Sequence, residues 1–348
     1  METSPHVTAL IPRHPRRSTA LLAVALLVAP LFAACSGGVS ATEVRTNGTA
    51  ATATATPGAP RPANLVPPGQ GAAPKQPTPV AAPAISARAA IVIDDVSGAV
   101  LYESNSHTRL FPASLTKIAT AALAIDRGNL DRLVTIDFDL DSPELDDATE
   151  MGLDYGDRFT LRDLIYGMLL PSGADASLAI AHAVAGSEQA FVQQMNAFME
   201  SLGLFDTHFL DPHGIGGPTH VSSAYDIAML SRYALRQPLF AKVVDTDEYK
   251  AVGSRTITVG NTNPWMFTYP GANGVKSGFT EQAGPTLSAS ATRSGHRVIV
   301  VVLDAPQRNA DTTALMDWAF NTFCWNDRAL GCAVQAVPAA ASTPVRPR

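Results

Sequence analysis

The sequence predicts an α+β fold, in which one mixed, mainly antiparallel sheet is flanked by helices and carries an inserted helical lobe. The first observation is that strand-like segments stand near both ends of the part of the chain that can fold. The second is that the long region between them carries apolar residues at three- and four-residue spacing, which is typical of helices. Strands at both ends imply one sheet whose first and last strands meet. A site is then expected in the cleft between sheet and lobe.

The predicted folded domain spans residues 85–332. Each of its strand-like segments is a short run rich in β-branched or apolar residues, bounded by turn residues such as Ser97-Gly98. These strands are expected at residues 89–94, 99–103, 285–292 and 296–303. Helices are expected where the apolar residues follow a helical period. They lie at residues 115–125, 161–170, 176–184, 191–202, 224–233 and 311–323.

Residues 1–35 are predicted to be a lipoprotein-type export signal. Arginines precede a short apolar run at residues 21–29, and small residues lead to Cys35. Such a run is too short to predict a stable membrane-spanning helix. The segment Ala33-Ala34-Cys35 is similar to the lipobox of bacterial lipoproteins, which implies that Cys35 is lipidated and that the lipid attaches the chain to a membrane. Ordinary secretion and an uncleaved anchor are the alternatives. The expected location is the outer face of the cytoplasmic membrane, the periplasm or the cell wall.

Two segments outside the folded domain have a composition that cannot form a core. Residues 36–84 consist mainly of Ala, Thr, Pro and Gly, and residues 333–348 are similar. With so few large apolar side chains, burial cannot offset the entropy of ordering, so a disordered tether and a disordered tail are expected. Cys324 and Cys332 enclose a short polar stretch just before the tail. In an exported protein this pair is expected to form a disulfide, with two free thiols as the alternative.

Charge and histidine spacing exclude two classes of function. The formal net charge of −6, with 46% hydrophobic and 16% charged residues, offers no basis for nucleic-acid binding. His213 and His220 lie in a loop rich in Gly and Pro, but neither a His-Glu-x-x-His motif nor paired-cysteine spacing accompanies them. No metal and no cofactor are therefore expected.

The stretch Phe111 to Thr120 carries the chemistry around which the chain is organised. Ser114 is expected in the first turn of a helix, and Lys117 follows three residues later on the same face. A serine hydroxyl becomes a good nucleophile when a nearby base takes its proton, and a lysine is such a base only if its pKa is lowered. The helix N-terminus, partial burial and a second cation would all lower it. Alone, this pattern more often marks the start of a surface helix.

Two further motifs join the first in the same order as in a known set. They are Ser172-Gly173-Ala174 in the helical region and Lys276-Ser277-Gly278 before the penultimate predicted strand. Ser-x-x-Lys, Ser-Asp-Asn and Lys-Thr-Gly motifs occur together in penicillin-binding proteins and class A β-lactamases. From about residue 85 to 323 the chain resembles the D-alanyl-D-alanine carboxypeptidase family of low-molecular-mass penicillin-binding proteins. Segments between the motifs, among them Asp211-Pro212-His213-Gly214, support the resemblance.

The resemblance implies a DD-peptidase/β-lactamase-like fold and a serine acyl-enzyme mechanism. The implied substrate is a peptidoglycan stem peptide that ends in D-Ala-D-Ala, and β-lactams are the implied covalent inhibitors. Ser114 would be the nucleophile, Lys117 its base and Ser172 a proton relay towards the leaving amine. The N–H groups of Ser114 and Phe279 would form the oxyanion hole. The residues implied in substrate binding are Lys276, Ser277, Gly278, Phe279 and Arg308.

Ala174 departs from the family pattern, because the family has asparagine at this position of the motif. An alanine has no amide to hold the substrate carbonyl or to position the lysine. Restoring asparagine at Ala174 is therefore expected to raise the acylation rate. The main expectation is a serine D-Ala-D-Ala carboxypeptidase. The alternatives are a D,D-endopeptidase of peptidoglycan cross-links, a β-lactamase-like hydrolase, and a weakly active or non-catalytic wall-binding protein.

Overall fold

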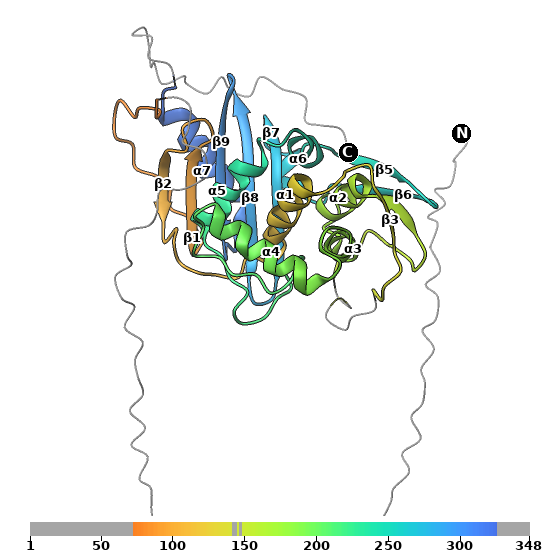
Figure 1. Ribbon diagram of the computed structural model, residues 1–348. Coiled ribbons are helices and arrows are strands. Elements are labelled where there is room, and N and C mark those ends of the chain that lie inside the picture. Colours follow the sequence, from red (N-terminus) through yellow and green to blue (C-terminus); the bar gives the residue numbers. More distant parts are fainter. Residues whose placement is uncertain (1–71, 141–144, 146–147, 326–348) are drawn as a thin grey trace, which may run out of the picture. The chain divides into compact units, whose positions relative to one another are not determined.

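A five-stranded antiparallel sheet forms the centre of the protein (Figure 1). The computed structural model describes residues 72–140, 145 and 148–325. The sheet order is β2-β1-β9-β8-β7, and each neighbouring pair is antiparallel. The strands are β1 (Ala89–Asp94), β2 (Val100–Ser104), β7 (Ala272–Thr280), β8 (Gly284–Arg293) and β9 (His296–Leu303). The first and last predicted strands meet as expected, with Ala89 opposite Leu303.

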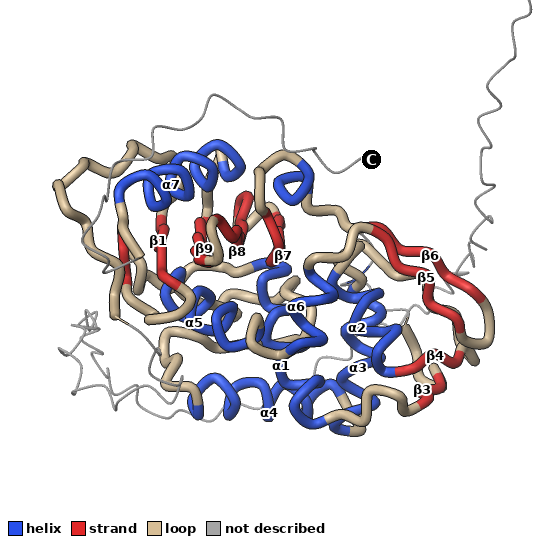
Figure 2. The backbone as a smooth tube through the Cα atoms, turned by 90° about the horizontal axis from the view of Figure 1, so that it is seen from above, coloured by secondary structure: helices blue, strands red, loops and turns tan. Residues whose placement is uncertain are grey.

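Helices cover both faces of this sheet, which explains why its central strands are apolar on both sides. In β1, Ile91 and Ile93 join the core that faces α1 (Lys117–Arg127) and α5 (Ala224–Ala234). Ala90 and Val92 of the same strand join a second core on the opposite face, under α7 (Arg308–Thr322). Figure 2 shows α7 on one side of the sheet and α5 and α1 on the other.

A helical lobe lies beside the β7 edge of the sheet (Figures 1 and 2). Its helices are α2 (Leu161–Leu169), α3 (Ala174–Ala185), α4 (Glu188–Ser201) and α6 (Pro238–Val244). Two short antiparallel strand pairs complete it, β3 (Leu133–Thr135) with β4 (Arg158–Thr160), and β5 (Glu248–Val252) with β6 (Thr256–Gly260). Local signals fix where the helices begin: Thr160 and Asp163 form a capping box at α2, and the Ser187 side chain caps α4.

Several elements were not expected from the sequence. The segment that carries Lys276 is itself strand β7, although it contains Asn273, Gly274 and Gly278, which have low strand propensity. Helix α6 and the strands β3 to β6 were also missed, because they are too short to show a clear period. Ser114 lies in a 3-10 turn, Ala113–Thr116, that precedes α1, and not in the first turn of the α-helix itself.

Contacts with the folded body begin before residue 85, where the sequence placed its start. The backbone of Lys75 exchanges hydrogen bonds of 3.0 and 2.8 Å with Cys324, and Trp318 Nε1 donates to the Val80 carbonyl. Cys324 is a disulfide-bonded cysteine. Its predicted partner Cys332, the lipidation residue Cys35 and the predicted signal and tail lie outside the described residues, so these remain predictions. Within the described ranges, no helix is both long and apolar enough to span a membrane.

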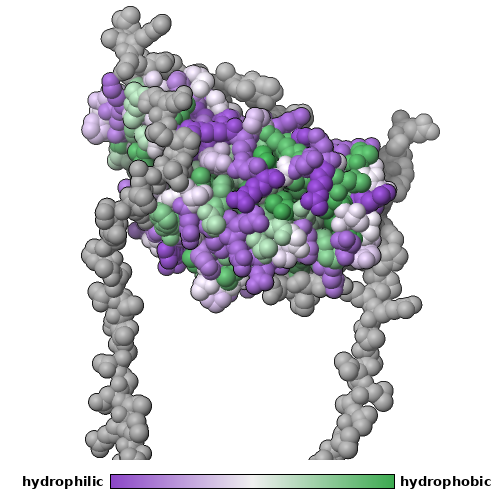
Figure 3. Space-filling view, viewed as in Figure 1, coloured by the Kyte–Doolittle hydropathy of each residue, from purple (hydrophilic) through white to green (hydrophobic). Residues whose placement is uncertain are grey.

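Exposed apolar side chains are scattered over the surface. Figure 3 shows small groups of hydrophobic side chains separated by hydrophilic ones on the face it presents. The large exposed hydrophobic residues include Leu133, Val252 and Phe279, which belong to different strands. Single exposed residues of this kind are normal for a folded protein. Phe279 is the one that lies next to the site described below.

Candidate active site

The 3-10 turn that carries Ser114 is packed directly against the free edge of β7. A Cβ atom added to Gly278 would lie 2.9 Å from the Ser114 backbone nitrogen and 3.1 Å from Ala113 Cβ. The position therefore needs glycine, because any side chain would push the strand away from the turn. From β8, Thr286 Oγ1 donates a 3.2 Å hydrogen bond to the Pro112 carbonyl, which ties the turn to the sheet.

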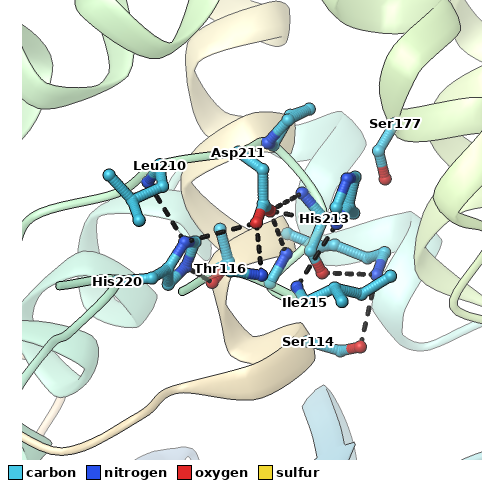
Figure 4. Close-up of polar contacts among 12 residues, drawn as sticks. Ser114, Thr116, Ser177, Leu210, Asp211, His213, Ile215 and His220 are labelled. Atoms are coloured by element: carbon cyan, nitrogen blue, oxygen red, sulfur yellow. Dashed lines mark hydrogen bonds and ion pairs between the residues drawn. The ribbon is translucent and has the colours of Figure 1, made fainter. Parts of the chain in front are cut away.

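Lys117 is buried beside the hydroxyl of Ser114, the residue labelled at the lower edge of the network in Figure 4. Its Nζ atom lies 3.2 Å from Ser114 Oγ and 2.6 Å from the His213 carbonyl oxygen, and the side chain is 2% exposed. Burial lowers the pKa of Lys117 to about 8, while the negative charges of Asp211 and Asp175 raise it. A useful fraction of the amine is then neutral near neutral pH, as a general base requires.

Ser172 contacts the same hydroxyl from the helical lobe. It lies between α2 and α3, and its Oγ atom donates to Ser114 Oγ across 3.0 Å. Its φ of 71° is in the left-handed region, which is uncommon for a residue other than glycine. The Thr149 hydroxyl holds the Ser172 carbonyl at 2.9 Å. Lys117, Ser114 and Ser172 thus form a continuous chain of groups that can move a proton.

Lys276 brings a second buried amine to the site from β7. It is 3% exposed, and its Nζ atom donates to the Ser277 carbonyl at 2.9 Å. Burial holds the pKa of Lys276 well below its ordinary value, and the positive charges of Lys117 and Arg308 lower it further. This positive environment suits an anionic ligand. Phe279, two residues beyond Ser277, is 62% exposed at the strand edge.

Arg308 supports β7 from the start of α7. One terminal nitrogen of its guanidinium donates to the Gly278 carbonyl at 2.9 Å and to the Thr286 carbonyl at 3.4 Å. The C=O and N–H groups of a trans peptide point in opposite directions, so this bond also sets the direction of the Phe279 N–H. An open hollow of about 450 Å³ is lined by Arg308, Phe279 and Asn309. Arg308 therefore stabilises β7, the strand that borders the site.

A buried loop after α4 lies behind Lys117, and sequence reasoning did not assign it a role. It contains Asp211, His213 and His220, all less than a tenth exposed. Burial lowers the pKa of His213 to about 4 and also lowers that of His220, so both are neutral near neutral pH. The Asp-Pro-His-Gly segment at residues 211–214 was the sequence feature that could have pointed to this loop. Within the described part of the chain, no group of three or more His, Cys, Asp or Glu residues could hold a metal ion.

Comparison with known proteins identifies the family. A family model described as D-alanyl-D-alanine carboxypeptidase matches residues 76–307. The chain belongs to the D-alanyl-D-alanine carboxypeptidase family.

The chain is similar to D-alanyl-D-alanine carboxypeptidases from several bacteria. It is 36% identical to DacF of Bacillus subtilis over 253 residues, which cover 68% of this chain and 63% of DacF. It is 35% identical to DacC of Escherichia coli over 267 residues, covering 70% and 64% of the two chains. The chain thus spans just under two thirds of the length of these relatives. The carboxypeptidase of Streptomyces sp. strain K15 is 35% identical over 262 residues, and the match covers 90% of it.

Solved structures of the family share the fold. The crystal structure of the Streptomyces K15 DD-transpeptidase aligns with a TM-score of 0.64 at 34% identity, covering 69% of this chain and 99% of that one. Penicillin-binding protein 6B from Escherichia coli aligns with a TM-score of 0.65 at 34% identity, covering 72% and 81% of the two chains. The expected DD-peptidase-like fold is therefore confirmed.

Ala174 is the residue that the sequence comparison of motifs predicts to depart from the family pattern. It is the first residue of α3, is 1% exposed, and packs in a small apolar cluster with Leu145 and Leu178. The next residue, Asp175, accepts hydrogen bonds from the backbone N–H groups of Met151, Gly152 and Leu153. Asp175 therefore holds a neighbouring loop, and its carboxylate does not replace the missing amide.

Proposed function

We propose that this chain is a serine D-Ala-D-Ala carboxypeptidase that acts on peptidoglycan stem peptides through an acyl-enzyme intermediate. The observation that carries the proposal is the position of Ser114 Oγ between two partners, 3.2 Å from Lys117 Nζ and 3.0 Å from Ser172 Oγ. The lysine is the base and the second serine the relay. Membership of the carboxypeptidase family supports the substrate class.

In the acylation step, Ser114 Oγ attacks the carbonyl carbon of the terminal D-Ala-D-Ala bond. Lys117 Nζ accepts the hydroxyl proton as the new C–O bond forms. The N–H groups of Ser114 and Phe279 stabilise the oxyanion, and the position of β7 against the nucleophile turn supports this pairing. When the C–N bond breaks, Ser172 relays a proton to the departing D-alanine amine. Water then hydrolyses the ester on Ser114 and returns the hydroxyl.

The substrate carboxylate is held on the β7 side of the site. The positive charge that Lys276 carries while protonated attracts it, and the Ser277 hydroxyl donates to it. Arg308 adds positive potential, and its contact with Gly278 keeps the strand in place. A β-lactam follows the same first step, but its leaving group stays attached and the acyl-enzyme persists. Lys276, Ser277, Gly278, Phe279 and Arg308 are thus proposed as the substrate-binding residues.

Export and lipid attachment at Cys35 place this activity outside the cytoplasm, where peptidoglycan lies. The signal-like residues 1–35 and the Ala/Thr/Pro-rich tether support this location. The proposed domain of residues 85–332 would then be tethered at a membrane surface. Labelling cells with a radioactive fatty acid tests the attachment: wild type should be labelled and Cys35→Ala unlabelled. Equal labelling would exclude Cys35 as the lipid site.

The activity is tested by release of D-alanine from a stem pentapeptide. Wild type should release D-alanine and Ser114→Ala should not. Cleavage of cross-linked muropeptide dimers without D-alanine release would favour the endopeptidase alternative. Rapid turnover of penicillin would favour the β-lactamase-like alternative. No reaction with any of the three substrates would favour a non-catalytic wall-binding protein.

A further inference from the structure

Asp211 is the centre of a buried hydrogen-bond network behind the two proposed catalytic groups (Figure 4). It is 6% exposed, and its carboxylate accepts from the backbone N–H groups of His213 at 2.8 Å, Gly214 at 2.5 Å and Gly216 at 2.5 Å. Its oxygens also lie 3.0 Å from His213 Nδ1 and 3.4 Å from His220 Nδ1. A hydrogen bond from an N–H group to a carboxylate is stronger than one to a neutral acceptor, so the three backbone bonds hold the turn in one conformation.

One branch of this network reaches Lys117. The turn that Asp211 closes presents the His213 carbonyl, which accepts the 2.6 Å bond from Lys117 Nζ. The preceding carbonyl, that of Pro212, accepts a 2.6 Å bond from Thr120 Oγ1. Two successive carbonyls of the loop therefore dock α1, at Lys117 and at the residue three positions later. A shift of the turn would move the amine relative to Ser114.

A second set of hydrogen bonds runs from Leu210, the residue before Asp211, to the nucleophile turn. The Leu210 N–H donates to His220 Nδ1 at 3.1 Å, which assigns the ring proton of a neutral histidine to Nε2. His220 Nε2 then donates to Thr116 Oγ1 at 2.8 Å, and Thr116 Oγ1 donates to the Ala113 carbonyl at 2.9 Å. The loop also touches this turn directly, because a Cβ atom on Gly214 would lie 2.0 Å from the Ala113 oxygen.

Because residue 174 is alanine, the position of Lys117 depends more strongly on this network. The family resemblance implies an asparagine at this position, whose side-chain amide would help to position the lysine, and alanine has none. In the residues that the structure describes, the hydrogen bonds of Lys117 Nζ go to Ser114 Oγ and the His213 carbonyl. We propose that Asp211 is a positioning residue, which holds the Lys117 amine and the Ser114 turn in register and substitutes for the missing amide. This inference rests on the proposed function.

The charges around Asp211 predict a change in the pH dependence of acylation, which separates a positioning role from a purely structural one. The groups that face it are Lys117 from α1 and the imidazoles of His213 and His220, and Glu188 lies 4.0 Å from His213 Nε2. Burial lowers the pKa of Lys117, and the Asp211 charge partly reverses this. Removing the Asp211 charge should lower the pKa of Lys117 further. The pH midpoint of acylation should therefore fall, and the maximal rate should fall as well. A purely structural role would change only the amount of folded protein.

The test compares Asp211→Asn with wild type in the full chain. The rate constant for acylation by a fluorescent penicillin is measured per folded molecule across about pH 6 to about pH 10. We expect a maximal rate about ten- to a hundredfold lower and a midpoint at lower pH, because the charge-assisted bonds that hold the turn are weakened. Asp163→Asn is the matched control. It is also a buried carboxylate, 5% exposed, but it holds the start of α2 and should leave the midpoint unchanged.

Two results would overturn the inference. The first is an Asp211→Asn variant with wild-type rate and midpoint; the second is a midpoint shift of the same size in Asp163→Asn. If Asp211→Asn does not fold, Thr116→Val and Thr116→Ser decide. The valine variant leaves His220 without its acceptor and should be acylated more slowly, whereas the serine variant should be near wild type. Equal rates in the two would reject the network. Absence of labelling in wild type would instead reject the proposed function.

Discussion

Lys117 Nζ lies closer to the backbone oxygen of His213, at 2.6 Å, than to Ser114 Oγ, at 3.2 Å. The shorter bond fixes the amine on a rigid carbonyl and leaves it directed at the hydroxyl. Burial of this amine without a directly paired carboxylate is unfavourable for the ammonium form. The contact therefore aims the base at the hydroxyl, while burial keeps its pKa low.

The pH dependence of acylation should follow the titration of Lys117. Burial lowers its pKa to about 8, and only the neutral amine can accept the Ser114 proton. The rate constant for acylation by penicillin should rise from about pH 6 to about pH 8 and level off above. Stopped-flow or gel-based labelling measures it. A rate that is flat or falls over this range would contradict the role of Lys117 as base.

Replacing Lys117 by methionine should abolish acylation and stabilise the fold near neutral pH. A pKa lowered from 10.5 to about 8 in a side chain that is 2% exposed corresponds to a cost on the order of 3 kcal/mol. Below about pH 8 the native lysine is charged and the full cost is present. Between pH 8 and pH 10.5 the native amine is already neutral while the unfolded chain still binds the proton, so the cost disappears.

Thermal unfolding of the two proteins checks this. Lys117→Met should melt higher than wild type at pH 7, and the difference should shrink as the pH rises towards the unfolded value. Lys242→Met, a change at an exposed lysine of α6, is the control and should show no such trend. If the difference in melting temperature grew with pH instead, it would contradict a lowered pKa of Lys117 in the folded protein.

Gly278→Ala should damage acylation with little change in fold. The added Cβ atom would meet Thr286 Oγ1 at 2.6 Å and the Ser114 nitrogen at 2.9 Å, so β7 must move away from the nucleophile turn. Loss of one oxyanion-hole donor costs about 10²–10³-fold in rate. Gly260→Ala in β6 is the matched control, since its nearest atom would lie 4.0 Å away. Similar acylation rates in the two variants would show that close packing at Gly278 is unimportant.

Ala174→Asn should raise the acylation rate and lower the melting temperature. The amide would restore the residue that the family resemblance implies, but it enters a cluster with Leu145 and Leu178 where Ala174 is 1% exposed. Burying a poorly paired amide costs about 1–3 kcal/mol. Ala174→Leu, which has the same branched arrangement of side-chain heavy atoms but no amide, is the control for steric effects. An unchanged or lower rate in Ala174→Asn would mean that the site has been rebuilt around alanine.

The sequence predicted the parts of the fold whose signals are local. Strand β1 is continuous and β-branched, and α2 has both a helical period and a capping box, so both were expected from their own residues. Strand β7 was missed because glycines at 274 and 278 weaken its local signal. These glycines serve tertiary packing, which local propensity does not report.

The site was predictable as a set of motifs but not as a network. Ser114, Lys117, Ser172 and Lys276 were selected by resemblance to a family, and their roles remain proposals. The Asp211 loop could not be placed behind Lys117, because the contact between Lys117 and His213 joins residues 96 positions apart. Arg308 was expected at the substrate carboxylate, and its contact with the Gly278 carbonyl depends on how α7 packs against the sheet.

The most direct test is to locate the acyl group after reaction with penicillin. The full chain is incubated with a penicillin, digested, and the modified peptide is identified by mass spectrometry. We expect one adduct, carried on Ser114 through an ester bond, and no adduct in Ser114→Ala. An adduct on Ser172 or elsewhere, or a protein that remains unmodified although it is folded, would contradict the assignment of Ser114 as the nucleophile.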